Sequence, residues 1–127
     1  MYSVETINIQ WAGQQLVSIE TPQLKLQPVK ISDLNDYMTL FSDKVAMKKY
    51  RGSCNEARFS TWVNRWEFHH FSALKVTDKI TNDFVGHGIL GHGDYENETS
   101  GWSEIAFITR PEYWNKKFKK LSVGNFM

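Results

Sequence analysis

Apolar and polar residues alternate in the first part of the chain, and this pattern predicts strands. The alternation covers residues 7–11, and a second apolar stretch starts at Leu16 after the turn-like Ala12-Gly13-Gln14, so we expect a hairpin. Residues 24–29 (LKLQPV) alternate again. This pattern indicates a half-buried strand that ends at Pro28, because proline has no N–H to donate within a sheet.

Two stretches with apolar residues at helical spacing follow. The first covers residues 34–45, with Ser32 as its predicted N-cap, a break expected near Ser42-Asp43, and Val45 continuing its apolar face. The second is capped by Asn55 and is amphipathic, which is typical of a helix packed on a sheet. Its apolar stripe consists of Phe59, Trp62, Val63, Trp66 and His70, and its polar remainder includes Arg58 and Arg65.

Three further strands with hairpin-like links are predicted in the last part of the chain. The first covers residues 71–76, the turn formers at 77–83 reverse the chain, and the second covers 83–91, whose glycines indicate bulges or close packing. The third is the apolar run 105–109, which fits a strand buried on both faces and ended by Pro111. The sequence therefore predicts an α+β fold with a mostly antiparallel sheet and two helices after the first strand.

Composition adds few constraints. The 127 residues are enough for one domain, and 41% apolar residues are enough for a core. The net charge of +1 implies no strongly charged partner. The single Cys54 cannot form a disulfide within the chain, and no signal peptide or membrane-length apolar run is visible. We therefore expect a cytoplasmic protein that does not enter a membrane.

Several segments resemble the GNAT family of N-acetyltransferases, in particular the branch that acetylates the N-termini of ribosomal proteins. Residues 104–107 (EIAF) and 110–114 (RPEYW) match the family's strand E-I-[GA]-[FY] and the R-P-E-Y-W that follows it. Residues 84–91 (FVGHGILG) resemble the preceding strand, and looser similarity extends the resemblance over residues 22–118. It implies a GNAT fold and acetyl transfer from acetyl-CoA to an amine, either an N-terminus or a small molecule.

The resemblance also implies where acetyl-CoA binds. Family members pair the pantetheine arm with the strand backbone, which here is Ala106, Phe107, Ile108 and Thr109. They hold the pyrophosphate on a glycine-rich loop before a helix, which here is Asn115, Lys116, Lys117 and Phe118. Asn115 and Lys117 replace two glycines that let the backbone approach a phosphate, so we expect weakened binding of acetyl-CoA. Glu104 is the candidate general base, and an ordinary carboxylate paired with Lys or Arg is the alternative reading.

The family's cofactor helix and its next strand have no counterpart before Met127. The resemblance therefore implies the N-terminal portion of a GNAT fold, an incomplete domain over residues 1–127 with weak or no activity. The alternative is a noncatalytic remnant or interaction module. An uncovered strand edge favours a homodimer in either case. A nucleic-acid binder that uses the lysines at 116–120 is a minor alternative, since such lysines are more often a solvated tail.

The remaining candidates for chemistry are weaker. His87 and His92 are an odd number of residues apart, so on a regular strand they point to opposite faces, and no third ligand has a recognisable spacing. We expect no metal site. Cys54 has no accompanying His or Asp pattern and is not expected to be a nucleophile. His69-His70 at a helix end are expected to satisfy the last carbonyl groups.

Overall fold

The computed structural model of the chain describes residues 8–50, 54–68, 72–92, 102–114 and 121–124, with side chains over 8–49, 54–68, 72–89 and 107–114. Its strands are β1 (Asn8–Ala12), β2 (Gln15–Glu20), β3 (Leu24–Pro28), β4 (Ala73–Asp78), β5 (Phe84–His92), β6 (Trp102–Thr109) and β7 (Leu121–Gly124). Its helices are α1 (Leu34–Ser42), α2 (Lys44–Tyr50) and α3 (Glu56–Arg65), with short 3-10 turns η1 (Ile31–Asp33) and η2 (Pro111–Tyr113).

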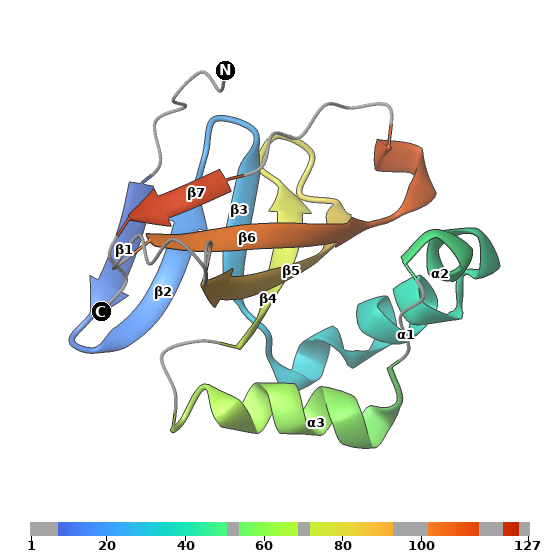
Figure 1. The fold of residues 1–127 in the computed structure, drawn as a ribbon, viewed down its shortest axis with the longest axis horizontal. Helices are drawn as coiled ribbons and strands as arrows, with labels where there is room; N and C mark the ends of the chain where they lie inside the picture. The colour runs from blue at the N-terminus through green and yellow to red at the C-terminus, as the bar shows by residue number, and fades with distance from the viewer. Residues whose placement is uncertain (1–7, 51–53, 69–71, 93–101, 115–120, 125–127) are drawn as a thin grey trace.

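Within these ranges, the strands form one sheet of seven in the order β1-β2-β3-β4-β5-β6-β7, and every neighbouring pair is antiparallel. Helices α1, α2 and α3 follow β3 and precede β4 in the sequence. In space they lie on one side of the sheet (Figure 1). The predicted α+β fold with a mostly antiparallel sheet is confirmed. Across the described ranges, no helix has both the length and the apolar character needed to cross a bilayer.

The sheet is strongly coiled, and near its centre both of its faces are buried. In Figure 1, β6 and β7 cross in front of β2 and β3 instead of continuing in the same plane. Leu74 and Val76 on one face of β4 are fully buried, and Ala73 on the other face is 5% exposed. A strand buried on both faces loses the simple alternation of apolar and polar residues.

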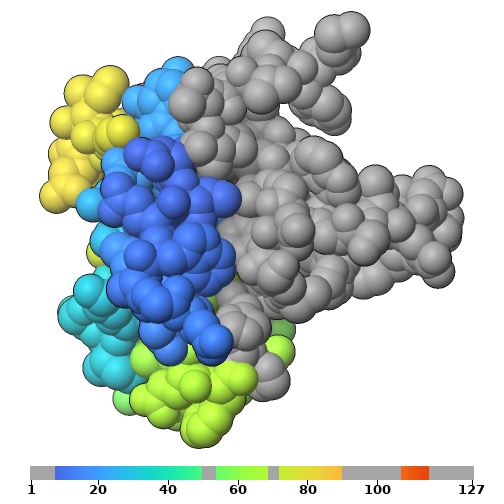
Figure 2. All heavy atoms as spheres, turned by 90° about the vertical axis from the view of Figure 1, so that its left-hand side faces the viewer, coloured from blue at the N-terminus to red at the C-terminus, as the bar shows by residue number. Residues whose placement is uncertain are grey.

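The predicted N-terminal hairpin is present. Ala12 pairs with Gln15 across the turn, and Gly13 has a φ of 63°, a left-handed conformation that glycine adopts without steric cost. Leu16 and Ile19 from this hairpin join the main hydrophobic core. Figure 2 shows the hairpin (blue) forming one flank of the molecule, with α3 (green) below it.

The start of the first helical segment differs from the prediction. Ser32 is not the N-cap: it lies inside η1, and Asp33 is the residue that precedes α1. The buried carboxylate of Asp33 accepts the backbone N–H of Lys30 at 2.9 Å and binds the Lys75 ammonium at 2.8 Å. An ion pair with β4 therefore fixes this turn, and Ser32 stays exposed.

The predicted break after the first helix is confirmed. The Asp43 carboxylate accepts the backbone N–H groups of Val45 and Ala46, at 2.9 and 3.0 Å, where α2 begins. Because the break rotates the following residues, Ala46 is buried and Val45 is 58% exposed. The prediction that Val45 continues the apolar face was therefore wrong.

The prediction for α3 is largely confirmed. The Asn55 side chain accepts the Arg58 backbone N–H at 2.8 Å and so caps the helix. Phe59 and Trp66 are buried, and Trp62 packs half-buried against the same core. His70 and its neighbour His69 lie outside the described residues.

Strands β5 and β6 approach each other unusually closely at Gly86, which pairs with Thr109. A Cβ at this position would collide with the carbonyl oxygen of Ile108 and lie 2.8 Å from the Cα of Thr109. These are backbone atoms in a buried ladder, so no flexible side chain can move aside. A glycine at residue 86 is therefore required for the pairing of the two strands.

We predict that Gly86→Ala destabilises the chain by about 1–3 kcal/mol, the usual range for forcing an extra methyl group into a close-packed site. Urea denaturation would measure the loss. The matched control is Gly13→Asn, since nothing lies within 4 Å of a Cβ at Gly13 and Asn tolerates a positive φ. Equal stability of the Gly86→Ala variant and the unmodified chain would contradict the close approach.

Candidate functional site

The turn after β6 is fastened to β5 by Arg110. Its backbone N–H donates to the Val85 carbonyl at 2.9 Å, and its guanidinium donates to the Phe84 carbonyl at 3.0 Å. The same guanidinium forms an ion pair with Glu112 at 2.6 Å. Pro111 then occupies the first position of η2, where its missing N–H costs nothing. The position of the chain as it leaves β6 is therefore set by this arginine and proline.

Trp114 links the end of β6 to the helices. Its indole N–H donates to the Thr109 carbonyl at 3.1 Å. The Lys49 ammonium of α2 lies 4.4 Å from the centre of the Trp114 ring, within the range of a cation–π interaction. Every residue of the RPEYW segment is thus within the turn that ends β6, and Arg110 and Trp114 fasten this turn to the strand backbone and to α2.

Among the described residues, the backbone of β6 has an open edge along its second half. Arg110 bonds Val85 across the ladder, so by alternation Ile108 and Ala106 direct their N–H and C=O groups toward β5. Phe107 and Thr109 direct theirs to the other side, as the Trp114 bond to the Thr109 carbonyl shows. On that side β7 pairs only with residues 102–105. Among the described residues, no strand pairs with residues 106–109 there.

The structure places only part of the predicted donor site. Ala106, Phe107, Ile108 and Thr109 lie consecutively at this edge, and Glu104 lies earlier in β6, where its backbone pairs with Gly91 and Ser122. The side chains of Glu104 and Ala106 are outside the described set, as is the predicted pyrophosphate loop Asn115–Lys116–Lys117–Phe118. The roles proposed for these residues stay predictions.

A pocket of about 230 Å³ opens on the helix side of the sheet, between α3 and strands β4 and β5. It is lined by Arg58, Trp62, Arg65, Ser72, Ala73, His87 and Ile89. In the ladder, His87 pairs with Ile108 and Ile89 pairs with Ala106. The pocket floor therefore lies one strand spacing, about 4.8 Å, from the β6 backbone at the predicted donor site.

His87 is buried in this floor and paired with Tyr37 of α1. The Tyr37 hydroxyl donates its one proton to the Leu74 carbonyl at 3.1 Å. The 2.8 Å contact between Tyr37 Oη and His87 Nδ1 therefore has the imidazole as donor, and its Nε2 carries a lone pair. The Trp62 ring stacks on the imidazole at 4.8 Å and 16°.

The surroundings of His87 keep it uncharged. Burial, followed by the positive charge of Arg58, lowers its pKa to about 3, so the imidazole is neutral at physiological pH. Every fully buried side-chain nitrogen or oxygen in the described part has a hydrogen-bond partner. Tyr37 is the partner of His87 Nδ1. The other ring nitrogen, Nε2, is also part of His87, which lines the pocket. At neutral pH, the uncharged imidazole of His87 can accept a hydrogen bond at Nε2, but it is a weak base.

The two arginines of the pocket were not singled out from the sequence. Arg58, Trp62 and Arg65 follow an i, i+4, i+7 spacing, so they share one face of α3. The Arg58 guanidinium lies 5.4 Å from the Trp62 ring centre. This spacing was the sequence signal that could have identified the two pocket arginines. It places both at the border of the apolar stripe, however, where arginines are ordinarily solvated.

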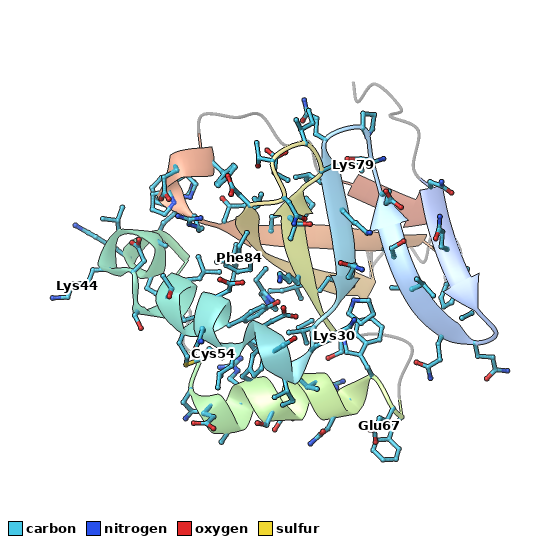
Figure 3. The ribbon with its side chains drawn as sticks, turned by 180° about the vertical axis from the view of Figure 1, so that it is seen from behind. Lys30, Lys44, Cys54, Glu67, Lys79 and Phe84 are labelled. Atoms are coloured by element: carbon cyan, nitrogen blue, oxygen red, sulfur yellow. The ribbon has the colours of Figure 1, made fainter. Side chains whose placement is uncertain are left out.

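Within the described residues, neither Cys54 nor the metal-ligating side chains point to a further site. Burial raises the pKa of the Cys54 thiol, which disfavours the reactive thiolate, and Cys54 lies in the loop before α3 (Figure 3). In the described ranges, no three His, Cys, Asp or Glu side chains are grouped so that they could hold a metal ion. The side chain of His92 lies outside those ranges.

We predict that acid destabilises the chain partly through His87. The unfolded chain binds a proton near the ordinary pKa of 6.5, whereas the folded chain binds it only near 3, so stability should fall as pH drops between these values. The loss should be about 1.4 kcal/mol per pH unit. Urea denaturation across this pH range should show the loss of unfolding free energy. The variant His87→Asn keeps a donor for Tyr37 but does not titrate, so it should lack the part of the loss that comes from His87. Identical pH profiles for both chains would contradict a buried neutral His87.

Comparison with known protein families bears on the whole of this region. A family model described as an acetyltransferase (GNAT) domain matches residues 23–127. The match begins one residue before β3 and includes the helices, the pocket and the open edge of β6, and it leaves out the hairpin β1–β2. No individual curated protein matches the chain significantly. Because the family model matches most of the sequence, the chain belongs to the GNAT acetyltransferase family.

Proposed function

We propose that this chain transfers an acetyl group from acetyl-CoA to an amine. The observation that carries the proposal is the outward-facing backbone of Phe107 and the outward N–H of Thr109, whose carbonyl is bonded by Trp114, at a strand edge that β7 leaves uncovered. The pantetheine arm contains amide groups, and an extended chain with amides can bind such an edge as an added strand. Membership in the family supports acetyl-CoA as the donor.

The residues of β6 suit the steps of such a transfer. The amine nitrogen attacks the thioester carbonyl carbon, the C–S bond breaks, the nitrogen loses a proton, and the sulfur leaves as a thiol after gaining one. An outward backbone N–H of β6 is the kind of donor that stabilises the charge on the carbonyl oxygen. His87 is unsuited to take the proton, because its pKa is about 3. Glu104 is the proposed base.

The acceptor is an N-terminal amine, as the resemblance of the RPEYW segment to the ribosomal-protein branch suggests, or the amine of a small molecule. The size of the pocket favours the second. Its volume of about 230 Å³ is below the roughly 300–1,000 Å³ of pockets for drug-sized ligands. A small amine fits such a space better than an extended peptide does.

We predict that acetyl-CoA binds the chain, with modest affinity because Asn115 and Lys117 replace glycines, and that Glu104→Gln lowers kcat for acetyl transfer about 10²- to 10⁴-fold. Binding of acetyl-CoA should be unchanged by this substitution. Calorimetry would measure the binding, and release of the free thiol would measure turnover.

The control for the Glu104 variant is Glu67→Gln, which removes an exposed carboxylate just beyond α3 (Figure 3). It should change neither quantity. Absence of detectable heat with millimolar acetyl-CoA would contradict the proposed function. Normal turnover by Glu104→Gln, with binding intact, would contradict only the role of Glu104.

The second candidate function is a noncatalytic module that forms a homodimer through an uncovered strand edge. The open edge of β6 over residues 106–109 favours it, because unpaired strand edges tend to pair with another chain. We predict a concentration-dependent dimer in sedimentation experiments. Acetyl-CoA should shift it toward monomer if both use this edge. A monomer at all concentrations would contradict the dimer.

A further inference from the structure

We propose that the pocket between α3 and strands β4 and β5 binds the carboxylate of the acceptor, so that the acceptor is a small amine that carries a carboxylate, such as a free amino acid. This inference rests on the proposed acetyl transfer and adds the class of acceptor. The pocket residues that carry it are Arg58, Arg65, Trp62 and His87.

The charge of the pocket is positive and locally unbalanced. Both arginines line it, and none of its described lining residues is an aspartate or glutamate. Within the described ranges, neither Arg58 nor Arg65 forms an ion pair. The field of Arg58 reaches the floor, since it contributes to the lowered pKa of His87. A guanidinium offers paired N–H donors that match the two oxygens of a carboxylate, which makes a carboxylate the best-fitting anion of a small amine.

The wall that carries these arginines is held rigidly. The Trp66 indole N–H of the segment after α3 donates to the Ala73 carbonyl at 2.8 Å, and the Ser72 hydroxyl donates to the Trp62 carbonyl at 2.7 Å. These bonds tie α3 to the start of β4. Trp62 also contacts both Arg58 and His87, with its ring centre 5.4 Å from the Arg58 guanidinium and 4.8 Å from the His87 ring centre. The Cα atoms of Arg58 and Arg65 therefore have a fixed position relative to the pocket floor.

The position of the pocket directs a bound ligand toward β6. Ile89 is 45% exposed and supplies an apolar surface beside the pocket floor. His87 Nε2, with its lone pair, can accept an N–H from the ligand. Both residues pair with the part of β6 that we propose holds the donor. A carboxylate at α3 therefore leaves the amine of the same small molecule pointing across β5 to the reacting strand.

The test compares amino acids with their uncharged counterparts. Acetyl transfer from acetyl-CoA would be measured for the common L-amino acids and for their C-terminal amides, with the unmodified chain and with Arg58→Gln, Arg65→Gln and Lys44→Gln. Lys44 is an exposed cation on α2, away from α3 (Figure 3), and serves as the matched control. We expect at least one amino acid to react better than its amide. Each arginine variant should raise the KM for that amino acid about 10- to 100-fold.

The KM for acetyl-CoA and the rates with the amides should stay unchanged in the arginine variants, and Lys44→Gln should behave like the unmodified chain. Equal rates for amino acids and amides, or an unchanged KM in both arginine variants, would overturn the inference while leaving acetyl transfer intact. Better turnover of peptides with blocked C-termini would overturn it in the same way.

A binding measurement separates the inference from the proposed function. The indole N–H signal of Trp62 in ¹⁵N-labelled protein would be followed during titration with the same amino acids and amides, without acetyl-CoA. A shift with an amino acid, absent with its amide and lost in Arg58→Gln, would support the pocket even if acetyl-CoA does not bind. No shift with any of the amino acids would overturn it.

Discussion

The antiparallel pairing of β5 with β6 is the constraint on which both proposed sites depend. It sets His87 opposite Ile108 and Ile89 opposite Ala106, so the pocket floor and the open strand edge have one fixed relation. The pairing requires a glycine at residue 86, because any side chain there would meet the β6 backbone. Arg110 then fastens the end of the ladder through two carbonyl groups of β5. A small change at this ladder would therefore move the donor strand and the acceptor pocket together.

The RPEYW segment illustrates how a recognisable motif can identify a family through its structural role. Arg110 bonds the β5 backbone, Pro111 starts η2, and Trp114 bonds the last carbonyl of β6. None of these contacts needs a substrate. They end β6 at a fixed place, so the strand edge before them has a defined position and direction. The motif therefore supports the acetyltransferase reading by positioning the strand on which the chemistry would occur.

The sequence predicted elements whose signals are local, and it failed where a contact joins distant residues. The Asn55 cap, the break at Ser42-Asp43 and the end of β6 depend on neighbours within a few residues, and all three are confirmed. The prediction of Ser32 as the N-cap failed because the ion pair of Asp33 with Lys75 joins residues that are far apart in the sequence. The bond between Tyr37 and His87, which decides the tautomer of His87, joins residues of α1 and β5 and has no local signature. The predicted donor site could be found in the sequence because its residues form one continuous strand. The pocket could not, because it depends on how α3 packs on the sheet.

Electrostatics explains why the two halves of the proposed site have different tasks. A histidine beside a reacting amine is ordinarily the first candidate for a proton acceptor, since its pKa lies near neutral. Here burial and Arg58 prevent protonation of His87, so it can orient an N–H but cannot hold the proton at neutral pH. The same arginine that makes His87 a poor base makes the pocket attractive to an anion. We therefore propose that α3 and β5 recognise the acceptor and that a group outside this positive pocket removes the proton, which is consistent with a carboxylate on β6.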